Sequence, residues 1–172
     1  MDINLTYRLP TLADQDALRT YVEEYYLNGE SGISASMNLT SMNYASWVDQ
    51  INRNIEIPNG DWVRSYTLLC FDEKKLVGLL SIRYELSEEL RQKYGDIGYG
   101  VRPKERRKGC ATIMLRHALD ICKEKGMEQV ELGCFRDNAA SIRTIKNNGG
   151  QLLRECEGFK EEKISQYYSI KL

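Results

Sequence analysis

Apolar residues in the first third of the chain recur at the spacing of a helix. In the segment 11–27 they fall on one face, which predicts a first helix there: Ala17, Leu18, Tyr21, Val22 and Tyr25. The stretch 28–43 is rich in Gly, Ser and Asn, so we expect a loop. Helical spacing resumes from Tyr44 to Ile55 and predicts a second helix.

Runs of β-forming residues dominate the middle of the chain. The runs 66–71 and 76–84 flank a polar connection of hairpin length, residues 72–75, and predict an antiparallel pair of strands. A further strand is expected over 96–101. Pro103 ends it, because proline has no N–H to donate to a strand ladder.

Helices and strands alternate in the second half. An apolar stripe runs along the segment 109–125 and predicts a helix that packs on a sheet. The alternating segment 130–134 predicts a strand. Asn138 then offers an N-cap for a short helix, which Gly149 closes.

Two last strands are expected over 151–156 and 164–170. The order of elements predicts an α/β fold, a central twisted mixed β-sheet with helices on both faces. Neither a repeat nor a linker interrupts the pattern, and 172 residues suit one compact domain. We therefore expect a single domain over residues 1–172.

Charge and hydropathy narrow the classes of partner. Lys and Arg number 24 and Asp and Glu 25, for a net charge of -1. Such a chain has no global basic field to hold a nucleic acid, so an anion must be bound locally. Apolar residues make up 42% but never run unbroken for the ~20 positions of a membrane helix, and the start lacks a signal peptide's apolar stretch. We expect a cytoplasmic protein without a membrane partner.

Cysteine and histidine usage argues against metal and triad chemistry. The five cysteines are widely spaced without a CxxC pair, so we expect reduced, buried thiols and no zinc: Cys70, Cys110, Cys122, Cys134 and Cys156. His117 stands alone. It is therefore interpreted as an ordinary helix residue.

The segment Gly98–Thr112 has the order strand, basic turn, helix start. A helix N-terminus has unpaired N–H groups and about half a positive charge, so this turn suits an anion such as a pyrophosphate. Gly109 would let the backbone come close. The segment is neither a Walker A loop nor a dinucleotide-binding fingerprint, since it lacks the glycine spacing of both motifs. On composition alone, a solvated charged turn stays the favoured alternative.

These residues resemble the GNAT superfamily of N-acetyltransferases. Its pyrophosphate loop, (R/Q)-x-x-G-x-(G/A), is matched by the run Arg106–Ala111. GNAT proteins also carry an Asn and a small residue near the pantetheine, and the segment Asp137–Ser141 matches them. Within the superfamily the chain is similar to a bacterial group of predicted acetyltransferases, through IGYGVRPKERRKGCATIML and NAASIRTIKNNGG. Two departures are Asp96, where that group usually has His, and Ser87, where it often has Asn.

The resemblance implies a GNAT fold and acetyl-CoA as cosubstrate, without a metal. Pantetheine would complete the ladder of a strand that splays from its parallel neighbour, at Tyr99, Gly100 and Val101. The pyrophosphate would lie on Arg106, Arg107, Lys108, Gly109, Cys110, Ala111 and Thr112. Asn138 and Ser141 would contact the thioester arm, although a plain N-cap role for Asn138 is equally compatible.

The implied reaction is direct attack of a neutral primary amine, on a small molecule or a peptide, on the thioester in a ternary complex. An alkyl amine has a pKa near ~10, so it must lose a proton first. Glu85 and Asp96, at strand ends, are the candidate bases. Solvated surface acids are the alternative for both. A backbone N–H near Val101 is expected to polarise the thioester carbonyl.

Many GNAT enzymes have a tyrosine that protonates the leaving thiolate at the position of Ile145. Tyr167 is therefore a candidate acid, with Tyr168 or Tyr99 as substitutes, although solvent would suffice for a thiol of pKa ~8.5.

Two other functions stay open: a CoA-binding sensor or scaffold without turnover, and nucleic-acid binding through residues 102–108. The acceptor is expected to be shaped by residues 28–43, by 86–95 and by the C-terminal hairpin. Both a monomer and a homodimer are compatible with the sequence.

Overall fold

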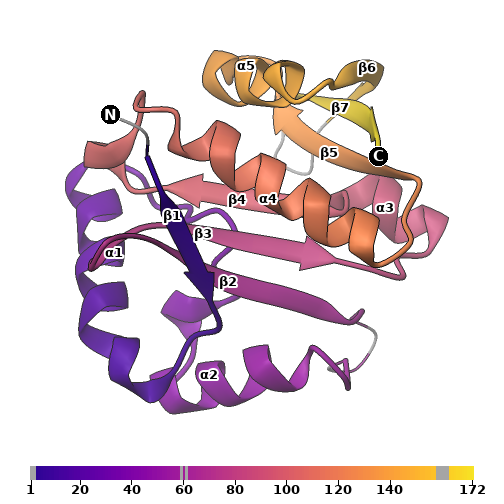
Figure 1. The fold of residues 1–172 in the computed structure, drawn as a ribbon. Coiled ribbons are helices and arrows are strands. Elements are labelled where there is room, and N and C mark those ends of the chain that lie inside the picture. The colour runs from indigo at the N-terminus through magenta and orange to yellow at the C-terminus, as the bar shows by residue number, and fades with distance from the viewer. Residues whose placement is uncertain (1–2, 59, 61, 158–162) are drawn as a thin grey trace.

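The computed structural model in Figure 1 describes residues 3–58, 60, 62–157 and 163–172. The strands are β1 (Leu5–Arg8), β2 (Ser65–Asp72), β3 (Lys75–Arg83), β4 (Ile97–Val101), β5 (Gln129–Phe135), β6 (Gln151–Glu157) and β7 (Ile164–Lys171). The helices are α1 (Gln15–Leu27), α2 (Tyr44–Arg53), α3 (Glu88–Tyr94), α4 (Cys110–Glu124) and α5 (Ala139–Asn147). Short 3₁₀ turns occupy Leu12–Asp14, Leu39–Ser41 and Pro103–Glu105.

The strands form two antiparallel sheets. One has the order β1-β2-β3-β4 and the other β5-β7-β6. The sheets meet at β4 and β5, which point in the same general direction and separate from each other in Figure 1. The predicted α/β class is confirmed. The expected mixed sheet is, however, divided into two sheets between β4 and β5, the neighbouring strands that run parallel.

Most predicted elements are confirmed, but β1 and α3 were missed. β1 has only four residues and alternates in burial, so it carries too few apolar positions for a pattern. α3 has no buried residue, so no apolar stripe indicates it. It starts at Ser87, whose hydroxyl accepts the Leu90 N–H at 3.3 Å as an N-cap does.

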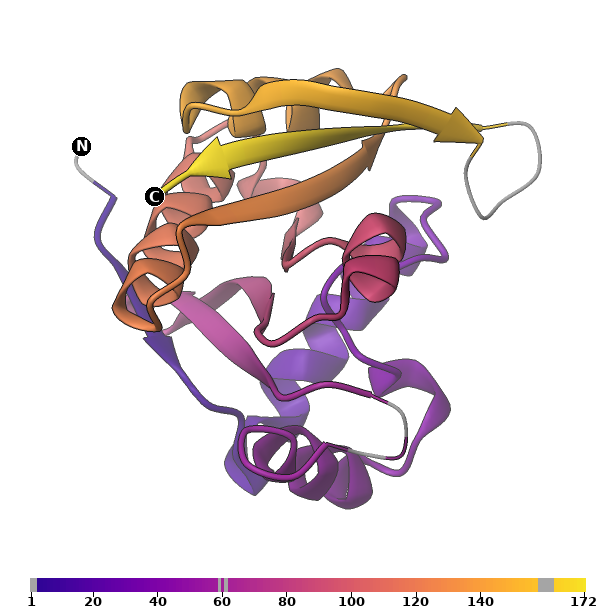
Figure 2. The same ribbon diagram turned by 90° about the vertical axis from the view of Figure 1, so that its right-hand side faces the viewer.

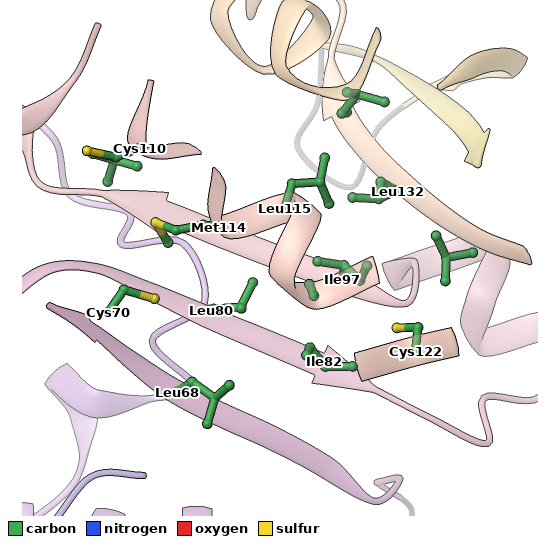
Figure 3. Close-up of a cluster of buried hydrophobic side chains, with 14 of the residues drawn as sticks. Leu68, Cys70, Leu80, Ile82, Ile97, Cys110, Met114, Leu115, Cys122 and Leu132 are labelled. Carbon is green, nitrogen blue, oxygen red and sulfur yellow. The ribbon is translucent and has the colours of Figure 1, made fainter. Parts of the chain in front are cut away.

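Helices cover both faces of the larger sheet. In Figure 2, α4 lies on one side of this sheet and α1 and α2 lie on the other. Figure 3 shows the core under α4, in which Leu68, Leu80 and Ile82 meet Met114 and Leu115. The opposite core packs alternate strand residues on α1 and α2: Leu69, Phe71, Leu76 and Leu79. Because β2 and β3 are buried on both faces, they show continuous apolar runs.

All five cysteines are free, as expected, but not all are buried. Cys70, Cys110 and Cys122 lie in the core. Cys134 is half-buried and Cys156 is exposed, so the expectation of buried thiols is wrong for these two. Cys156 lies on β6, the edge strand of the smaller sheet, most of which faces solvent.

Two wider properties follow from the described residues alone. Their helices include none that is both long and apolar enough to cross a membrane. In the same part of the chain, His, Cys, Asp and Glu side chains do not gather into a group that would hold a metal ion. His117 instead stacks its ring on Tyr7, with centroids 3.8 Å apart.

A first prediction concerns the close approach of β3 to β4. A Cβ at Gly78 would lie 2.6 Å from the Gly100 carbonyl oxygen and 2.7 Å from Cε of Met114. The Met114 side chain is flexible, but the β4 backbone is not. Gly78→Ala should therefore lower the free energy of unfolding by about 1–3 kcal/mol in urea titrations. Gly32→Ala is the control, because nothing lies within 4 Å of its Cβ position; equal losses in both would contradict this packing.

Candidate functional site

One edge of β4 is left without a strand partner. The Arg83 N–H donates to the Asp96 carbonyl at 2.7 Å. This bond fixes which residues of β4 turn their backbone groups towards β3. Backbone groups in such a ladder alternate between the two edges, so those of Tyr99 and Val101 face away from β3. Among the described strands, none pairs with that edge. Tyr99 thus offers a backbone donor and acceptor, and Val101 a backbone donor, to an extended ligand.

The gap between β4 and β5 closes at Asp96. Its N–H donates to the Glu131 carbonyl at 2.7 Å, and its Oδ2 accepts the Glu131 N–H at 2.7 Å. In a regular parallel ladder the Glu131 N–H would donate to the Tyr94 carbonyl. That carbonyl instead accepts a hydrogen bond from Nη2 of Arg83 at 3.2 Å. Oδ1 of Asp96 accepts from Arg91 at 3.2 Å. The side chain is fully buried, and burial raises the pKa of this carboxyl.

The other end of β4 is held by two tyrosines of α1. Tyr21 donates its phenol to the Gly100 carbonyl at 3.2 Å, and Tyr25 donates to the Val101 carbonyl at 3.0 Å. A Cβ on Gly100 would lie 2.9 Å from the Ser34 carbonyl oxygen, so the loop 28–43 rests on this strand. The loop expected to shape the acceptor site therefore lies against the face of β4 at Gly100.

The turn before α4 presents unpaired amides. Arg107 and Gly109 both have positive φ, 62° and 90°. In the part of the chain that the structure describes, the N–H groups of Lys108, Gly109 and Ala111 have no protein acceptor. Nothing lies within 4 Å of the Cβ position of Gly109, so the space outside the turn is open. Successive amides at a helix N-terminus form a concave anion site.

The basic side chains of this turn are mostly paired within the protein. Arg106 binds both carboxylate oxygens of Glu30, at 2.7 and 3.0 Å, and lowers the pKa of that carboxyl. Lys108 binds Glu105 at 2.8 Å. Arg107 is exposed and forms no ion pair with any described residue. Of the three expected cations, Arg107 is thus the one ready to meet a ligand, and the amides themselves are not blocked by carboxylates.

The residues expected at the thioester arm lie together, although they are far apart in sequence. Asn138 accepts the Ser141 N–H at 3.1 Å, so it is the N-cap of α5. The Ser141 hydroxyl is 2.8 Å from the Tyr99 hydroxyl. Burial raises the pKa of Tyr99 to about 12. This contact joins α5 to β4 beside the gap.

The candidates for proton transfer lie in two places. Asp96 and Tyr167 both lie against the α3 segment, since the Tyr167 phenol donates to the Lys93 carbonyl at 3.0 Å. Glu85 lies in the exposed turn after β3 and is hydrogen-bonded to both Nε and Nη2 of Arg64, which lowers the pKa of its carboxyl. Ile145, at the position of the missing tyrosine, is buried in the core.

Sequence reasoning missed four residues that build the site: Tyr21, Tyr25, Glu30 and Arg83. The tyrosines show only the helical spacing of a core stripe, and their acceptors lie 79 and 76 residues away. Glu30 is likewise 76 residues from Arg106. No local pattern reveals pairs at such separations.

Comparison with known proteins assigns the family. The model of the acetyltransferase (GNAT) family matches residues 37–149, so this chain belongs to the GNAT acetyltransferases. No curated protein matches the sequence.

Solved structures confirm the fold. The putative acetyltransferase yncA from Salmonella typhimurium, with its cofactor acetyl-CoA, has a TM-score of 0.67 at 18% identity, with 98% of this chain and 94% of that chain covered. The ribosomal L7/L12 alpha-N-protein acetyltransferase RimL, in complex with CoA, has 0.72 at 17%, with 99% and 96% covered. Mycobacterium smegmatis RimJ, in complex with CoA-disulfide, has 0.75 at 16%, with 97% and 81% covered. The cosubstrate is acetyl-CoA, as the family and these bound groups indicate.

A second prediction tests the amide turn. Gly109→Glu should weaken CoA binding by at least about 100-fold, because a carboxylate would stand where the diphosphate approaches. Any side chain at φ 90° also adds strain of about 1–2 kcal/mol. Gly109→Ala is the matched control, since it has the strain without the charge. Calorimetry should show a far smaller loss for Ala, and equal losses would assign the effect to strain alone.

Proposed function

We propose that this protein is an N-acetyltransferase that moves the acetyl group of acetyl-CoA to a primary amine of a small molecule or peptide. One observation carries the proposal: the unpaired edge of β4 leads directly to the unpaired amides of Lys108, Gly109 and Ala111. An extended chain with amides and a diphosphate matches both features at once. The acceptor amine would enter from the other side of the gap.

The coenzyme would be bound mainly through backbone groups. The Val101 carbonyl already accepts Tyr25 and Nε of Arg106, the latter at 2.9 Å, so it is not available to pantetheine. The Val101 N–H and both backbone groups of Tyr99 remain for the pantetheine amides. The diphosphate would then lie on the turn, with Arg107 as its charged contact.

The transfer itself would proceed by direct attack in a ternary complex. The amine nitrogen forms a bond to the acetyl carbon, the C–S bond breaks, the amine loses a proton and the thiolate gains one. A nucleophilic side chain is not required. Cys70, Cys110 and Cys122 are buried, which disfavours them as intermediate acetyl carriers.

For the proton of the amine we favour Asp96 over Glu85. Asp96 lies where β4 and β5 meet, and burial raises the pKa of its carboxyl, which makes that carboxylate a stronger base. Arg64 lowers the pKa of Glu85, which makes that carboxylate a weaker base. Because Asp96 has no exposed surface, the proton would reach it only when the α3 segment opens.

For the leaving thiolate, the structure offers two phenols. Tyr167 is tied to the Lys93 carbonyl, and Tyr99 is joined to the Ser141 hydroxyl beside the gap. The Tyr99–Ser141 pair lies on the strand that would bind pantetheine, so we propose it as the nearer proton source. Solvent protonation stays sufficient for a thiol of pKa ~8.5.

Two features bear on the partners. RimL is named for acetylation of ribosomal L7/L12, which supports a peptide acceptor. The microcin C7 self-immunity acetyltransferase MccE, of similar fold, was crystallised with acetyl-CoA and AMP, which supports a small-molecule acceptor as well. Arg102, Arg106 and Lys108 are paired with carboxylates of the protein, which disfavours nucleic-acid binding by this turn. We propose a cytoplasmic site of action, where free thiols persist.

A third prediction tests turnover. The purified protein, given acetyl-CoA and a panel of polyamines, amino acids, aminoglycosides and peptides, should release free thiol with at least one amine. Gly109→Glu should abolish that release. If CoA binds and no amine is acetylated, the protein is a CoA sensor or scaffold, which the buried Ile145 in place of a tyrosine would also suit.

A fourth prediction tests the base. Asp96→Asn should lower kcat/KM by about 100-fold or more, and the loss should shrink at high pH, where the amine is already neutral. Glu85→Gln is the matched control and should change the pH profile little. If Asp96→Asn lowers the Tm while kcat/KM per folded molecule and its pH profile are unchanged, Asp96 only joins the two strands.

A further inference from the structure

The face of the larger sheet that α1 and α2 cover changes from apolar to polar along β2 and β3. Leu69 and Leu79 pack against these helices, but Thr67, Ser81 and Arg83 continue the same face towards the other end of β2 and β3. Thr67 and Ser81 lie directly opposite each other in the β2–β3 ladder. A polar row therefore replaces the apolar core at the end of the sheet where Asp96 joins it to β5.

This polar row is buried without being satisfied. Thr67 is 1% exposed and Ser81 is 0% exposed. Within the described residues, neither hydroxyl has a hydrogen-bond partner. An unpaired buried polar group costs about 1–3 kcal/mol, so a core would gain from apolar residues here. Sites that break the packing rules in this way are often functional.

Arg83 is a buried cation that forms no ion pair with a carboxylate of the described residues. Its guanidinium donates to two carbonyls, Gly95 at 2.8 Å and Tyr94 at 3.2 Å, and Nη1 has no hydrogen bond to any described residue. Burial lowers its pKa to about 10. Asp96 is the nearest opposing charge, but its two oxygens are engaged by Arg91 and the Glu131 N–H. A buried charge of this kind favours an anionic partner.

The guanidinium borders the gap in which the reaction is proposed. A Cβ on Gly98 would lie 3.5 Å from Nη2 and 3.7 Å from Nη1 of Arg83. Gly98 is only half-buried and precedes Tyr99, the residue proposed to pair with pantetheine. Because Gly98 has no side chain, nothing on it covers these two nitrogens of the guanidinium. Ser81 lies opposite Gly98 in the β3–β4 ladder, next to this uncovered side of Arg83.

We propose that Arg83 binds a carboxylate of the acceptor, so that the substrate class is amines with a nearby carboxylate, as in amino acids. The inference rests on the proposed acetyl transfer. A guanidinium pairs with a carboxylate through charge-assisted hydrogen bonds, and a carboxylate held over Gly98 brings the neighbouring amine towards the thioester. Ser81 stands beside this space as a hydroxyl donor. The competing reading is that Arg83 only caps the carbonyls at the end of α3.

The test compares amino acids with their decarboxylated amines, leucine with isoamylamine and phenylalanine with phenethylamine. The native protein should show kcat/KM about 10- to 100-fold higher for the member with the carboxylate. Arg83→Gln should bring this ratio towards unity. Arg53→Gln is the control, because Arg53 lies on the surface of α2 and pairs with Asp49. It should retain the native ratio.

A second variant covers the case in which Arg83→Gln does not fold. Gly98→Ala adds a methyl at ordinary contact distance from Nη1 and Nη2 of Arg83, so it should fold normally and yet cover the guanidinium against a carboxylate. It should reduce the ratio as well. If both folded variants keep the native ratio, or if the native protein does not prefer the carboxylate, Arg83 is only a cap of α3 and the proposal is overturned.

Binding is measured separately from turnover. Calorimetry of the CoA-loaded protein with leucine and with isoamylamine should show tighter binding of leucine, lost in Arg83→Gln. Such binding without acetylation would support the carboxylate site and contradict the transfer. Acetylation without a preference for leucine would support the transfer and overturn the carboxylate site. Absence of leucine binding at millimolar concentration would overturn it too.

Discussion

The candidate site depends on the way in which Asp96 joins β4 to β5. Its backbone N–H and its carboxylate both bind Glu131, so the two strands are fixed at one point. The Tyr94 carbonyl, to which a regular parallel ladder would send the Glu131 N–H, is used by Arg83. From Asp96 towards Val101 the two strands separate, and none of the described strands pairs with that edge of β4. The gap that opens there is the place that acetyl-CoA is proposed to fill.

The charges around the turn explain how a chain of net charge -1 can bind a diphosphate. Glu30 and Glu105 neutralise Arg106 and Lys108, so the basic side chains do not create a broad positive surface. Attraction then comes from the unpaired amides, the dipole of α4 and Arg107, all of which act at short range. Glu30 also connects the turn to the start of the loop 28–43, so the proposed coenzyme and acceptor sites would share one structural element.

Of the two glycines of β4, Gly100 serves packing and Gly98, in our proposal, serves binding. Gly100 lacks a side chain because Ser34 and Tyr25 occupy that space, and a side chain at Gly98 would contact the guanidinium of Arg83. In our proposals, the same strand therefore binds the coenzyme along its edge and admits the acceptor on its face. Its position between α1 and the smaller sheet gives both partners a rigid support.

Local patterns determined much of this protein by themselves. The β2–β3 hairpin, the stripe of α4, the N-cap at Asn138 and the glycine at the start of α4 depend on neighbours within a few residues, so the sequence predicts them. The amide turn was predictable for the same reason, because a helix N-terminus creates its own unpaired donors.

Only the tertiary structure decided which groups stay unpaired. β1 and α3 have too few apolar positions to be predicted from the sequence, and they form because the rest of the fold provides partners. Tyr25, Glu30 and Arg83 acquire their roles from contacts that the chain closes over long separations. Hydrophobic periodicity specifies which face of an element is buried, but it does not specify which polar group meets which. The pairing of Arg106 with Glu30, and the burial of Arg83 without a carboxylate, were therefore fixed by packing and not by sequence pattern.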